Sequence, residues 1–281
     1  MIVTVVGLGL IGGSMALALK SSGFASTVLG VEINQQHQKT ALKLKLVDRI
    51  ENLKNAVQKS KLIIISIPVN QSGKVITEIL NYCDKQTVID VGSTKNELAR
   101  MLQKHPKRGN YVASHPIAGT EFSGPEAAVN DLFKNKVTII CDKEKSSKKA
   151  CNLTHSMYES LGMNFIYMSS KDHDVHSAYV SHISHISSFS LALSVMNKEK
   201  DEKNILNMAG SGFESTVRLA KSNHEMWTPI FIENKENILE VLNNYIQQLQ
   251  FFKEAIINEN QENLSALIKE ANGIKKILDN N

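Results

Sequence analysis

Hydrophobic residues in the first half of the chain fall into short runs separated by amphipathic stretches. The runs are rich in β-branched residues and predict strands at residues 2–6, 27–31, 62–67, 87–91, 111–113 and 137–141, with helices at 14–21, 36–45, 71–82 and 95–104. Strands that are apolar throughout, rather than alternating, are typical of a parallel sheet covered on both faces. Because parallel strands need helical crossovers, the pattern predicts an α/β fold with a Rossmann-type doubly wound sheet.

The pattern changes near residue 168. The polar segment 169–174 offers helix N-cap candidates, and strand-like runs then largely disappear. We therefore predict a Rossmann domain at 1–168 and an all-α domain at 169–281. Close to the end, apolar residues recur at alternating spacings of four and three, a heptad-like stripe that needs a partner surface in the domain or in a second subunit. The stripe consists of Ile238, Leu242, Tyr245, Leu249, Phe252 and Ile256.

Length and composition narrow the classes of function. The 281 residues suffice for about two domains, and 32 basic against 28 acidic residues leave a charge of +4. Lysines are interspersed with acids, so we expect no nucleic-acid partner. No apolar run is long enough to span a bilayer, and we expect no membrane association. The cysteines Cys83, Cys141 and Cys151 are odd in number and lack CxxC spacing, which favours a reducing compartment and a cytoplasmic protein.

A glycine motif, Gly7-Leu8-Gly9-Leu10-Ile11-Gly12, follows the first predicted strand and opens a helix. Gly7 suits a tight turn, Gly9 the close approach of a pyrophosphate, and Gly12 tight packing of helix on strand. The helix start, with Leu10 and Ile11, offers unpaired N–H groups to phosphates. The motif predicts a dinucleotide site, and the alternative is a glycine turn that binds no ligand.

Polar residues end several strands at the edge where such sheets bind ligands. Glu32 ends the second strand, where a carboxylate bonds ribose hydroxyls and repels a 2′-phosphate. Since no arginine follows it directly, we expect NAD rather than NADP. Ser66 and Pro68 close the strand 62–67, and we place both in the cofactor site. Ser93 follows the strand 87–91 and is predicted either to bond substrate or nicotinamide, or to cap the next helix.

The chain contains nine histidines, in two notable settings. His115 follows the strand 111–113 at the ligand edge. Four more lie between residues 173 and 185, which suggests a metal site. On a continuous helix, residues nine apart face opposite sides, so His173 opposes His182 and His176 opposes His185, whereas His182 and His185 share a face. We therefore expect no metal and favour core histidines or contacts with anions and hydroxyls.

The motifs together resemble the prephenate dehydrogenase family of tyrosine biosynthesis. The resemblance covers essentially the whole chain, and its specific parts are His-Pro-Ile-Ala-Gly-Thr-Glu at 115–121 and Ser-His-x-x-His at 181–185. It implies NAD-dependent oxidative decarboxylation of prephenate to 4-hydroxyphenylpyruvate, with CO₂ and NADH as products. It also implies a homodimer formed through the helical domain. The matching segments are residues 7–14, 66–69, 92–95, 114–121, 173–174, 181–185, 212–227 and 231–234.

The resemblance also implies roles for single residues. His115 matches the catalytic histidine that accepts a hydrogen bond from the ring hydroxyl, and an imidazole suits this task near neutral pH. Ser93 matches the serine that positions the hydroxyl and that histidine. His185 and Arg218 match substrate-binding positions, where a dianion needs a fixed charged fork.

Further positions complete the implied substrate site. Glu121 matches a gating acid at the pocket mouth, and Trp227 a tryptophan that shapes the pocket. Thr120 and His182 belong to the same motifs, and we predict that they also bind the substrate. Two departures stand out: Ser215 where the family often has an aspartate in an intersubunit ionic network, and His224 where a proline is common. We expect no appended regulatory domain, which leaves tyrosine or product to compete directly in the pocket.

Other functions are kept as alternatives. Arogenate, with an amino group in place of the keto oxygen, is the nearest alternative substrate. A β-hydroxyacid dehydrogenase would carry a lysine on the first long helix of the second domain, but residues 173–196 contain none. A nucleotide-binding sensor without catalysis and a metal-dependent binding module are the non-enzymatic alternatives.

Overall fold

The computed structural model describes residues 1–279. It contains two compact units, Met1–Lys235 and Glu236–Asn281. This division differs in place from the boundary at 168/169 expected from the sequence, because the first helices after β8 pack within the first unit. The domain boundary at 168/169 stays a prediction.

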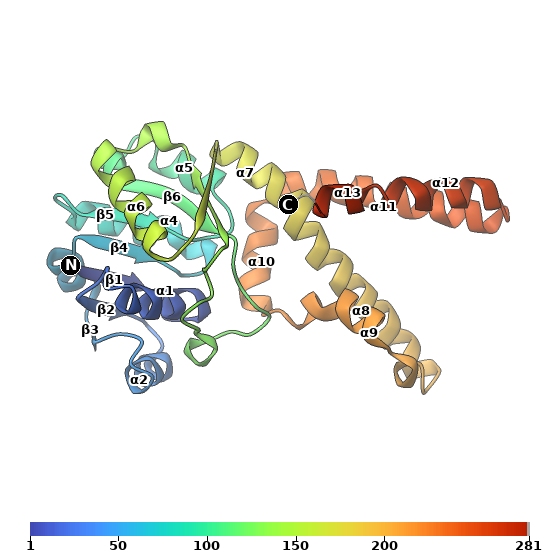
Figure 1. Ribbon diagram of the computed structural model, residues 1–281, viewed down its shortest axis with the longest axis horizontal. Helices are drawn as coiled ribbons and strands as arrows, with labels where there is room; N and C mark the ends of the chain where they lie inside the picture. The colour runs from blue at the N-terminus through green and yellow to red at the C-terminus, as the bar shows by residue number, and fades with distance from the viewer. Residues whose placement is uncertain (280–281) are drawn as a thin grey trace. The chain divides into compact units, whose positions relative to one another are not determined.

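An eight-stranded sheet forms the centre of the first unit, in the order β3-β2-β1-β4-β5-β6-β7-β8. Figure 1 labels the strands of this sheet from β1 to β6. The order reverses direction between β1 and β4, as in a doubly wound sheet, so the predicted Rossmann-type fold is confirmed. The strands are β1 (Ile2–Val6), β2 (Thr27–Val31), β3 (Arg49–Ile50), β4 (Leu62–Ile65), β5 (Thr87–Asp90), β6 (Tyr111–Pro116), β7 (Val137–Cys141) and β8 (Asn164–Met168).

The sequence predicts a parallel sheet, and this prediction is wrong for one pair of strands. β7 pairs with β6 in the antiparallel sense, while all other neighbours are parallel. The connection from β6 to β7 holds only a short 3₁₀ turn, η2 (Pro125–Ala127), and no crossover helix. Without a crossover helix the chain returns beside β6 in the opposite direction.

Helices cover both faces of the sheet, as predicted. Ile63 and Ile65 of β4 join one buried cluster with residues of α4 and α5, whereas Ile64 joins the other, with residues of α1 and α6. This separation follows from the alternation of side chains along a strand. The helices are α1 (Leu10–Ser21), α2 (Gln35–Lys43), α3 (Leu53–Lys59), α4 (Val69–Tyr82), α5 (Asn96–Leu102) and α6 (Lys148–Ser160).

A series of helices completes the first unit. They are α7 (Ser170–Ser177), the π-helical turn η4 (Ala178–His182), α8 (Ile183–Asp201), η5 (Leu206–Met208), α9 (Ser211–Val217), the 3₁₀ turn η6 (Arg218–Lys221) and α10 (His224–Glu233). α7 packs on α5 and α10 packs on α4. These contacts bring the histidine-rich segment to the carboxyl edge of the sheet.

The π-helical turn corrects the expected phase of the histidines. A π turn closes i→i+5 hydrogen bonds and so rotates the following residues away from their α-helical positions. His173 and His182 are both buried instead of facing opposite sides of one helix. A phase argument that assumes an unbroken helix therefore fails across this turn.

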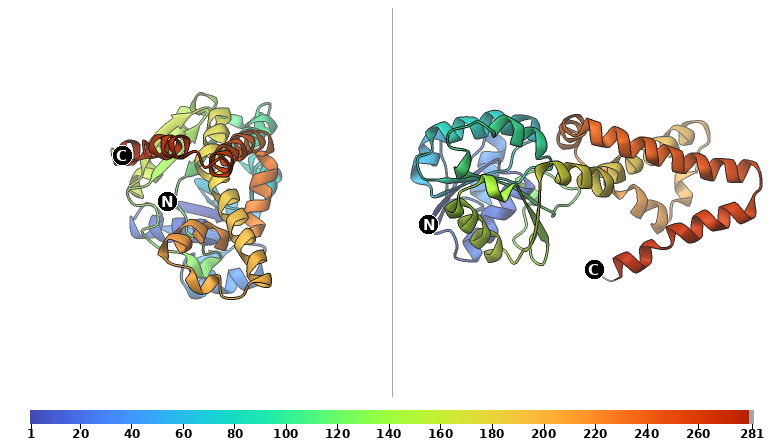
Figure 2. Two further views of the ribbon diagram at one scale, coloured as in Figure 1. Left: turned by 90° about the vertical axis from the view of Figure 1, so that its right-hand side faces the viewer. Right: turned by 90° about the horizontal axis from the view of Figure 1, so that it is seen from above.

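The second unit consists of α11, which begins at Lys235 (Lys235–Ile257), α12 (Gln261–Ala271) and α13 (Ile274–Leu278). The chain reverses direction between α11 and α12 (Figure 2). Much of the heptad-like stripe is uncovered, because Leu249 is 52% and Ile256 62% exposed. None of the helices among residues 1–279 has the length and apolar character needed to cross a bilayer.

Candidate active site

The glycine motif forms a tight turn between β1 and α1. Gly7 has a φ of +88°, and a Cβ there would fall 2.1 Å from the Ser66 carbonyl oxygen. A Cβ on Gly12 would lie 1.9 Å from the Gly7 carbonyl oxygen. Gly9 differs, since a Cβ would meet no atom within 4 Å. The turn and the close packing predicted for Gly7 and Gly12 are therefore present, and open space lies beside Gly9.

Three strand ends meet at this turn. The Glu32 carboxylate, after β2, accepts hydrogen bonds from the backbone N–H groups of Leu8 and Asn34, both at 2.9 Å. Ser66, after β4, lies against Gly7 and donates its backbone N–H to Val6 at 2.7 Å. This crevice is the topological switch point of the sheet.

The remaining residues of the predicted cofactor site surround the turn. Leu10 is buried and Ile11 half-buried at the start of α1. Pro68 is exposed and occupies the N-cap position of α4. The structure therefore brings the glycine motif, Glu32 and Ser66 together, whereas Pro68 precedes α4 and Ser93 follows β5.

A chain of hydrogen bonds joins β6 to α7. His115 Nδ1 lies 2.8 Å from His173 Nε2, and His173 Nδ1 lies 2.7 Å from Asp174 Oδ1. The Asp174 carboxylate also accepts from the backbone N–H groups of Lys95 and Asn96, each at 2.8 Å. Asp174 thus bonds both the histidine pair and the start of α5.

These contacts test the capping interpretation of Ser93. The N-cap residue of α5 is Lys95, and Asp174 accepts the N–H groups at that helix start. The prediction that Ser93 caps this helix is therefore wrong. Ser93 is half-buried beside the network, and no hydrogen bond joins it to His115 within the described part of the chain.

Burial sets the charge state of the histidine pair. It lowers the pKa of His115 well below its usual value, and the neighbouring His173 and Lys95 add to this effect. Burial likewise lowers the pKa of His173, against the opposing influence of Asp174. Both rings are therefore neutral near pH 7.

A buried ion pair lies beside the two histidines. The Lys95 ammonium contacts the Asp90 carboxylate at the end of β5, and both side chains are almost fully buried. Asp90 also accepts the Tyr111 hydroxyl at 2.6 Å and the Gly92 backbone N–H at 3.1 Å. The pair has no net charge, but it holds the Lys95 ammonium in place close enough to lower the pKa of His115.

A second group of rings adjoins this network. Asn234 Nδ2 donates to the Asp174 carbonyl at 2.7 Å and lies 3.1 Å from His182 Nδ1. Burial lowers the pKa of His182 to about 4. The His185 ring stacks on Trp227 with 3.4 Å between ring centres, and His182 meets the same indole edge-on at 6.0 Å.

A third group lies at the exposed side of the unit. Arg218 Nη1 is 3.4 Å from Glu121 Oε2, and 52% of the arginine side chain is exposed. Thr120 is exposed, and its hydroxyl accepts the Phe122 N–H at 3.3 Å. Ser215 donates to the Gly212 carbonyl at 2.9 Å. Among residues 1–279, no hydrogen bond or ion pair links Arg218 to His115.

Sequence reasoning assigned no role to several residues of the network. His173 and Asp174 were noted in a motif, while Lys95, Asp90 and Asn234 drew no functional prediction. Lys95, Asp90 and Asn234 bond residues on other elements, and the sequence does not show such contacts. The adjacent His173 and Asp174 are the part of the network that the sequence pattern indicated. Within the described residues, no three His, Cys, Asp or Glu side chains come together as a metal site.

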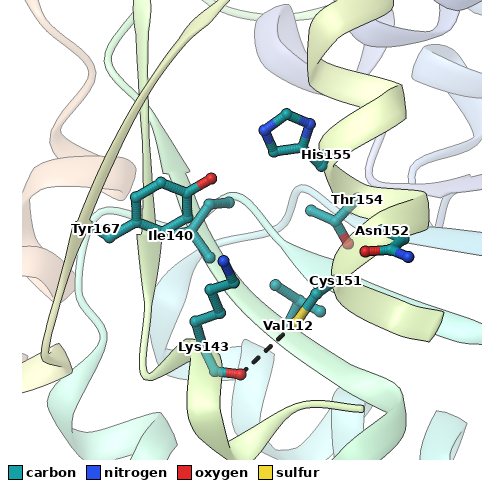
Figure 3. A pocket seen from close by; sticks show the side chains of 8 residues that line it. All are labelled: Val112, Ile140, Lys143, Cys151, Asn152, Thr154, His155 and Tyr167. Atoms are coloured by element: carbon teal, nitrogen blue, oxygen red, sulfur yellow. Dashed lines mark hydrogen bonds between the residues drawn. The ribbon is translucent and has the colours of Figure 1, made fainter. Parts of the chain in front are cut away.

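The structure also holds a small cavity between α6 and the strands β7 and β8, away from the residues described above (Figure 3). Its volume is about 60 Å³, and Lys143, Cys151, His155 and Tyr167 are among its lining residues. The Lys143 ammonium lies over the Tyr167 ring, 4.8 Å from its centre. No predicted site residue lines this cavity, and its volume is far below the roughly 300–1,000 Å³ of ordinary ligand pockets.

Comparison with known proteins places this geometry in a family. Residues 15–167 match the prephenate dehydrogenase nucleotide-binding domain, and residues 169–270 match the prephenate dehydrogenase dimerization domain. The chain is 31% identical over 269 residues to prephenate dehydrogenase of Bacillus subtilis, covering 94% of this chain and 72% of the relative.

Solved structures agree with the family models. Prephenate dehydrogenase from Aquifex aeolicus, in complex with hydroxyphenyl propionate and NAD⁺, superposes with a TM-score of 0.89 at 31% identity, covering 99% of this chain and 97% of that one. Arogenate dehydrogenase of Synechocystis gives a TM-score of 0.78 at 28% identity, covering 99% and 100%. Both halves of the chain match one family in fold and in sequence, and the chain belongs to the prephenate dehydrogenase family.

Proposed function

We propose that the chain catalyses the NAD-dependent oxidative decarboxylation of prephenate to 4-hydroxyphenylpyruvate and CO₂. The observation that carries the proposal is the neutral His115 at the carboxyl end of β6, hydrogen-bonded through His173 to Asp174. A neutral imidazole there is suited to accept the proton of a substrate hydroxyl. Membership of the family supports the same reaction.

The reaction requires that the substrate ring be positioned and that one group accept the hydroxyl proton. The hydroxyl-bearing ring carbon loses a hydride, the ring carboxylate leaves as CO₂, and the electron pair of the broken bond makes the ring aromatic. NAD, when bound, supplies the acceptor for the hydride. Aromatisation drives the reaction, so the protein chiefly orients the ring and takes up the hydroxyl proton. We assign to His115 the uptake of the hydroxyl proton, which returns to the phenolate oxygen to give 4-hydroxyphenylpyruvate. We assign the orientation of the hydroxyl to Ser93.

The cofactor site fits a dinucleotide. The open space beside Gly9 adjoins the start of α1, where free N–H groups favour a pyrophosphate. The Glu32 carboxylate is held at the end of β2 by two backbone N–H groups. We propose that this carboxylate bonds the adenosine ribose and that the cofactor is NAD, as in the Aquifex complex.

The preference for NAD can be measured directly. A carboxylate facing a 2′-phosphate costs several kcal/mol, so kcat/KM with NAD should exceed that with NADP by about 100-fold or more. Glu32→Gln, which removes the charge and keeps the shape, should reduce this ratio by at least about tenfold. A wild-type preference for NADP would show that Glu32 has another role.

Gly9→Ala tests the phosphate cradle without disturbing the fold. The added methyl group meets no protein atom within 4 Å, so the melting temperature should stay within a few degrees of wild type. It occupies the space proposed for the pyrophosphate, and the Kd for NAD should rise about tenfold or more. Gly109→Ala, whose methyl group would make only contacts at 3.8 Å far from the turn, is the matched control. An unchanged Kd in Gly9→Ala would exclude this cradle.

The substrate site requires groups for a dianion. We propose that Arg218 and His185 bind the substrate carboxylates, that Glu121 gates access, and that Trp227, Thr120 and His182 shape the pocket. Support comes from the exposed guanidinium beside Glu121 and from the stacking of His185 on Trp227. Arogenate is the second candidate substrate, favoured by the likeness to the Synechocystis enzyme.

We propose a homodimer built through the helical region. The dimerization-domain match and the exposed Leu249 and Ile256 of α11 support it. Apolar side chains uncovered along a helix are stabilised by a second copy of the same surface. Sedimentation velocity should give twice the mass of one chain, and Leu249→Glu should shift the protein toward the monomer. A wild-type monomer at micromolar concentration would contradict the proposal.

A further inference from the structure

The hydrogen bonds around Asp174 determine where the protons of the adjacent histidines lie. Both carboxylate oxygens accept backbone N–H groups, from Lys95 and Asn96, and a backbone amide can only donate. Asp174 is therefore an acceptor at both oxygens. Its third partner, His173 Nδ1, lies 2.7 Å away and must carry the hydrogen of that bond.

The same reasoning extends one residue further. His173 is fully buried, and burial lowers its pKa, so the ring is neutral and its Nε2 is an acceptor. That nitrogen lies 2.8 Å from His115 Nδ1. His115 must then donate through Nδ1, which leaves its Nε2 as the unprotonated nitrogen of a neutral ring.

Resting on the function proposed above, we propose that His173 and Asp174 are positioning residues that hold His115 in the tautomer with an unprotonated Nε2. Only this tautomer can take up the proton of the substrate hydroxyl at Nε2, because the other presents an N–H there. Neither His173 nor Asp174 needs to contact the substrate. They act through His115, much as a carboxylate orients the histidine of a catalytic triad.

The surroundings keep this arrangement fixed. Asp174 caps α5 through its side chain, and its carbonyl accepts Asn234 Nδ2 at 2.7 Å. The charged groups that face the pair are Asp174 itself and the ion pair of Lys95 with Asp90. A further titratable neighbour is His182, which accepts from the same Asn234 amide and is neutral above about pH 4. Lys95 opposes any added positive charge on either imidazole.

The tautomer can be observed without any assay of activity. In the wild-type enzyme labelled with ¹⁵N-histidine, NMR should show a protonated Nδ1 and an unprotonated Nε2 for His115, identified by the signals lost in His115→Asn. In Asp174→Asn the carboxylate that fixes His173 is gone, and the His115 proton should move wholly or partly to Nε2. The kcat should fall by about 10²–10⁴-fold, as for a triad carboxylate changed to an amide, with KM within about threefold.

Asp142→Asn is the matched control. Asp142 is also buried and also anchors α7, since Ser170 donates to it through its N–H at 3.1 Å and its hydroxyl at 2.8 Å, but it touches no histidine. If Asp174→Asn acted only by loosening α7, Asp142→Asn should therefore have the same effect on the tautomer and on kcat. We expect Asp142→Asn to keep the wild-type tautomer and kcat within about threefold.

Two further outcomes keep the test decisive. If Asp174→Asn fails to fold, His173→Phe removes the acceptor of His115 Nδ1 while keeping a ring, and His115 should again carry its proton on Nε2. A wild-type spectrum with the proton on Nε2, or an Asp174→Asn enzyme with wild-type tautomer and kcat, would overturn the proposal. A wild-type enzyme that oxidises neither prephenate nor arogenate would refute the proposed function, while the spectrum would still report on the tautomer.

Discussion

His115→Asn should lower kcat by about 10²–10⁴-fold, the range that a positioned general base contributes. Asparagine keeps a polar side chain of similar size but cannot take up the hydroxyl proton. Substrate and NAD contacts lie on other residues, so KM and the Kd for NAD should change less than about threefold. Steady-state kinetics and NAD titration measure both.

A second histidine gives the control for this variant. His155 on α6 is half-buried and stacks on Phe165 with ring centres 3.9 Å apart, outside the proposed site. His155→Asn should retain kcat within about threefold. Wild-type turnover in His115→Asn would refute the assigned mechanism.

The protonation of His115 sets the acid limb of the pH profile. Because the pKa of His115 lies well below 6.5, the base is already neutral at pH 7 and activity should decline only as the pH falls far enough to protonate it. In His115→Asn the residual kcat should lack this limb. An acid limb centred at or above pH 6.5 in the wild-type enzyme would contradict the half-buried, neutral imidazole.

Arg218→Ala should raise KM for the substrate by about 10–100-fold, which corresponds to the roughly 1.5–3 kcal/mol of a hydrogen bond to a charged group. The guanidinium is half exposed and contacts Glu121 at 3.4 Å, a distance that leaves its other donors for a carboxylate. Chemistry occurs at the ring, so kcat should change less than about fivefold.

The matched control lies on the same 3₁₀ turn. Lys221 is an exposed cation that pairs with Glu214 at 3.7 Å. Lys221→Ala removes a positive charge of similar exposure and should leave KM within about twofold. Equal KM values for Arg218→Ala and wild type would remove Arg218 from the substrate site.

Much of the fold follows from local pattern. The apolar runs at β1, β2, β4 and β5 and the glycine turn between β1 and α1 are specified by residues close together in the chain. β7 was misjudged in direction because direction depends on the connection from β6, which lacks a helix. The short β3 and the half-exposed β8 gave weak hydrophobic signals, and neither was predicted.

The candidate site was predictable only in part. His115 and Arg218 stand in recognisable motifs, whereas the function of Asp174 depends on bonds to Lys95 and Asn96, 79 and 78 positions away. The capping interpretation of Ser93 failed because that distant carboxylate accepts the helix N–H groups. The π-helical turn η4 shifts the phase of His182, and a sequence periodicity cannot show such a turn.

The reaction itself is the most direct test of the proposed function. Purified wild-type enzyme should convert prephenate and NAD to equal amounts of 4-hydroxyphenylpyruvate, CO₂ and NADH, with a kcat/KM for prephenate above that for arogenate. A higher kcat/KM for arogenate would reassign the substrate within the family. Folded enzyme that binds NAD but forms no NADH from prephenate would contradict the central claim.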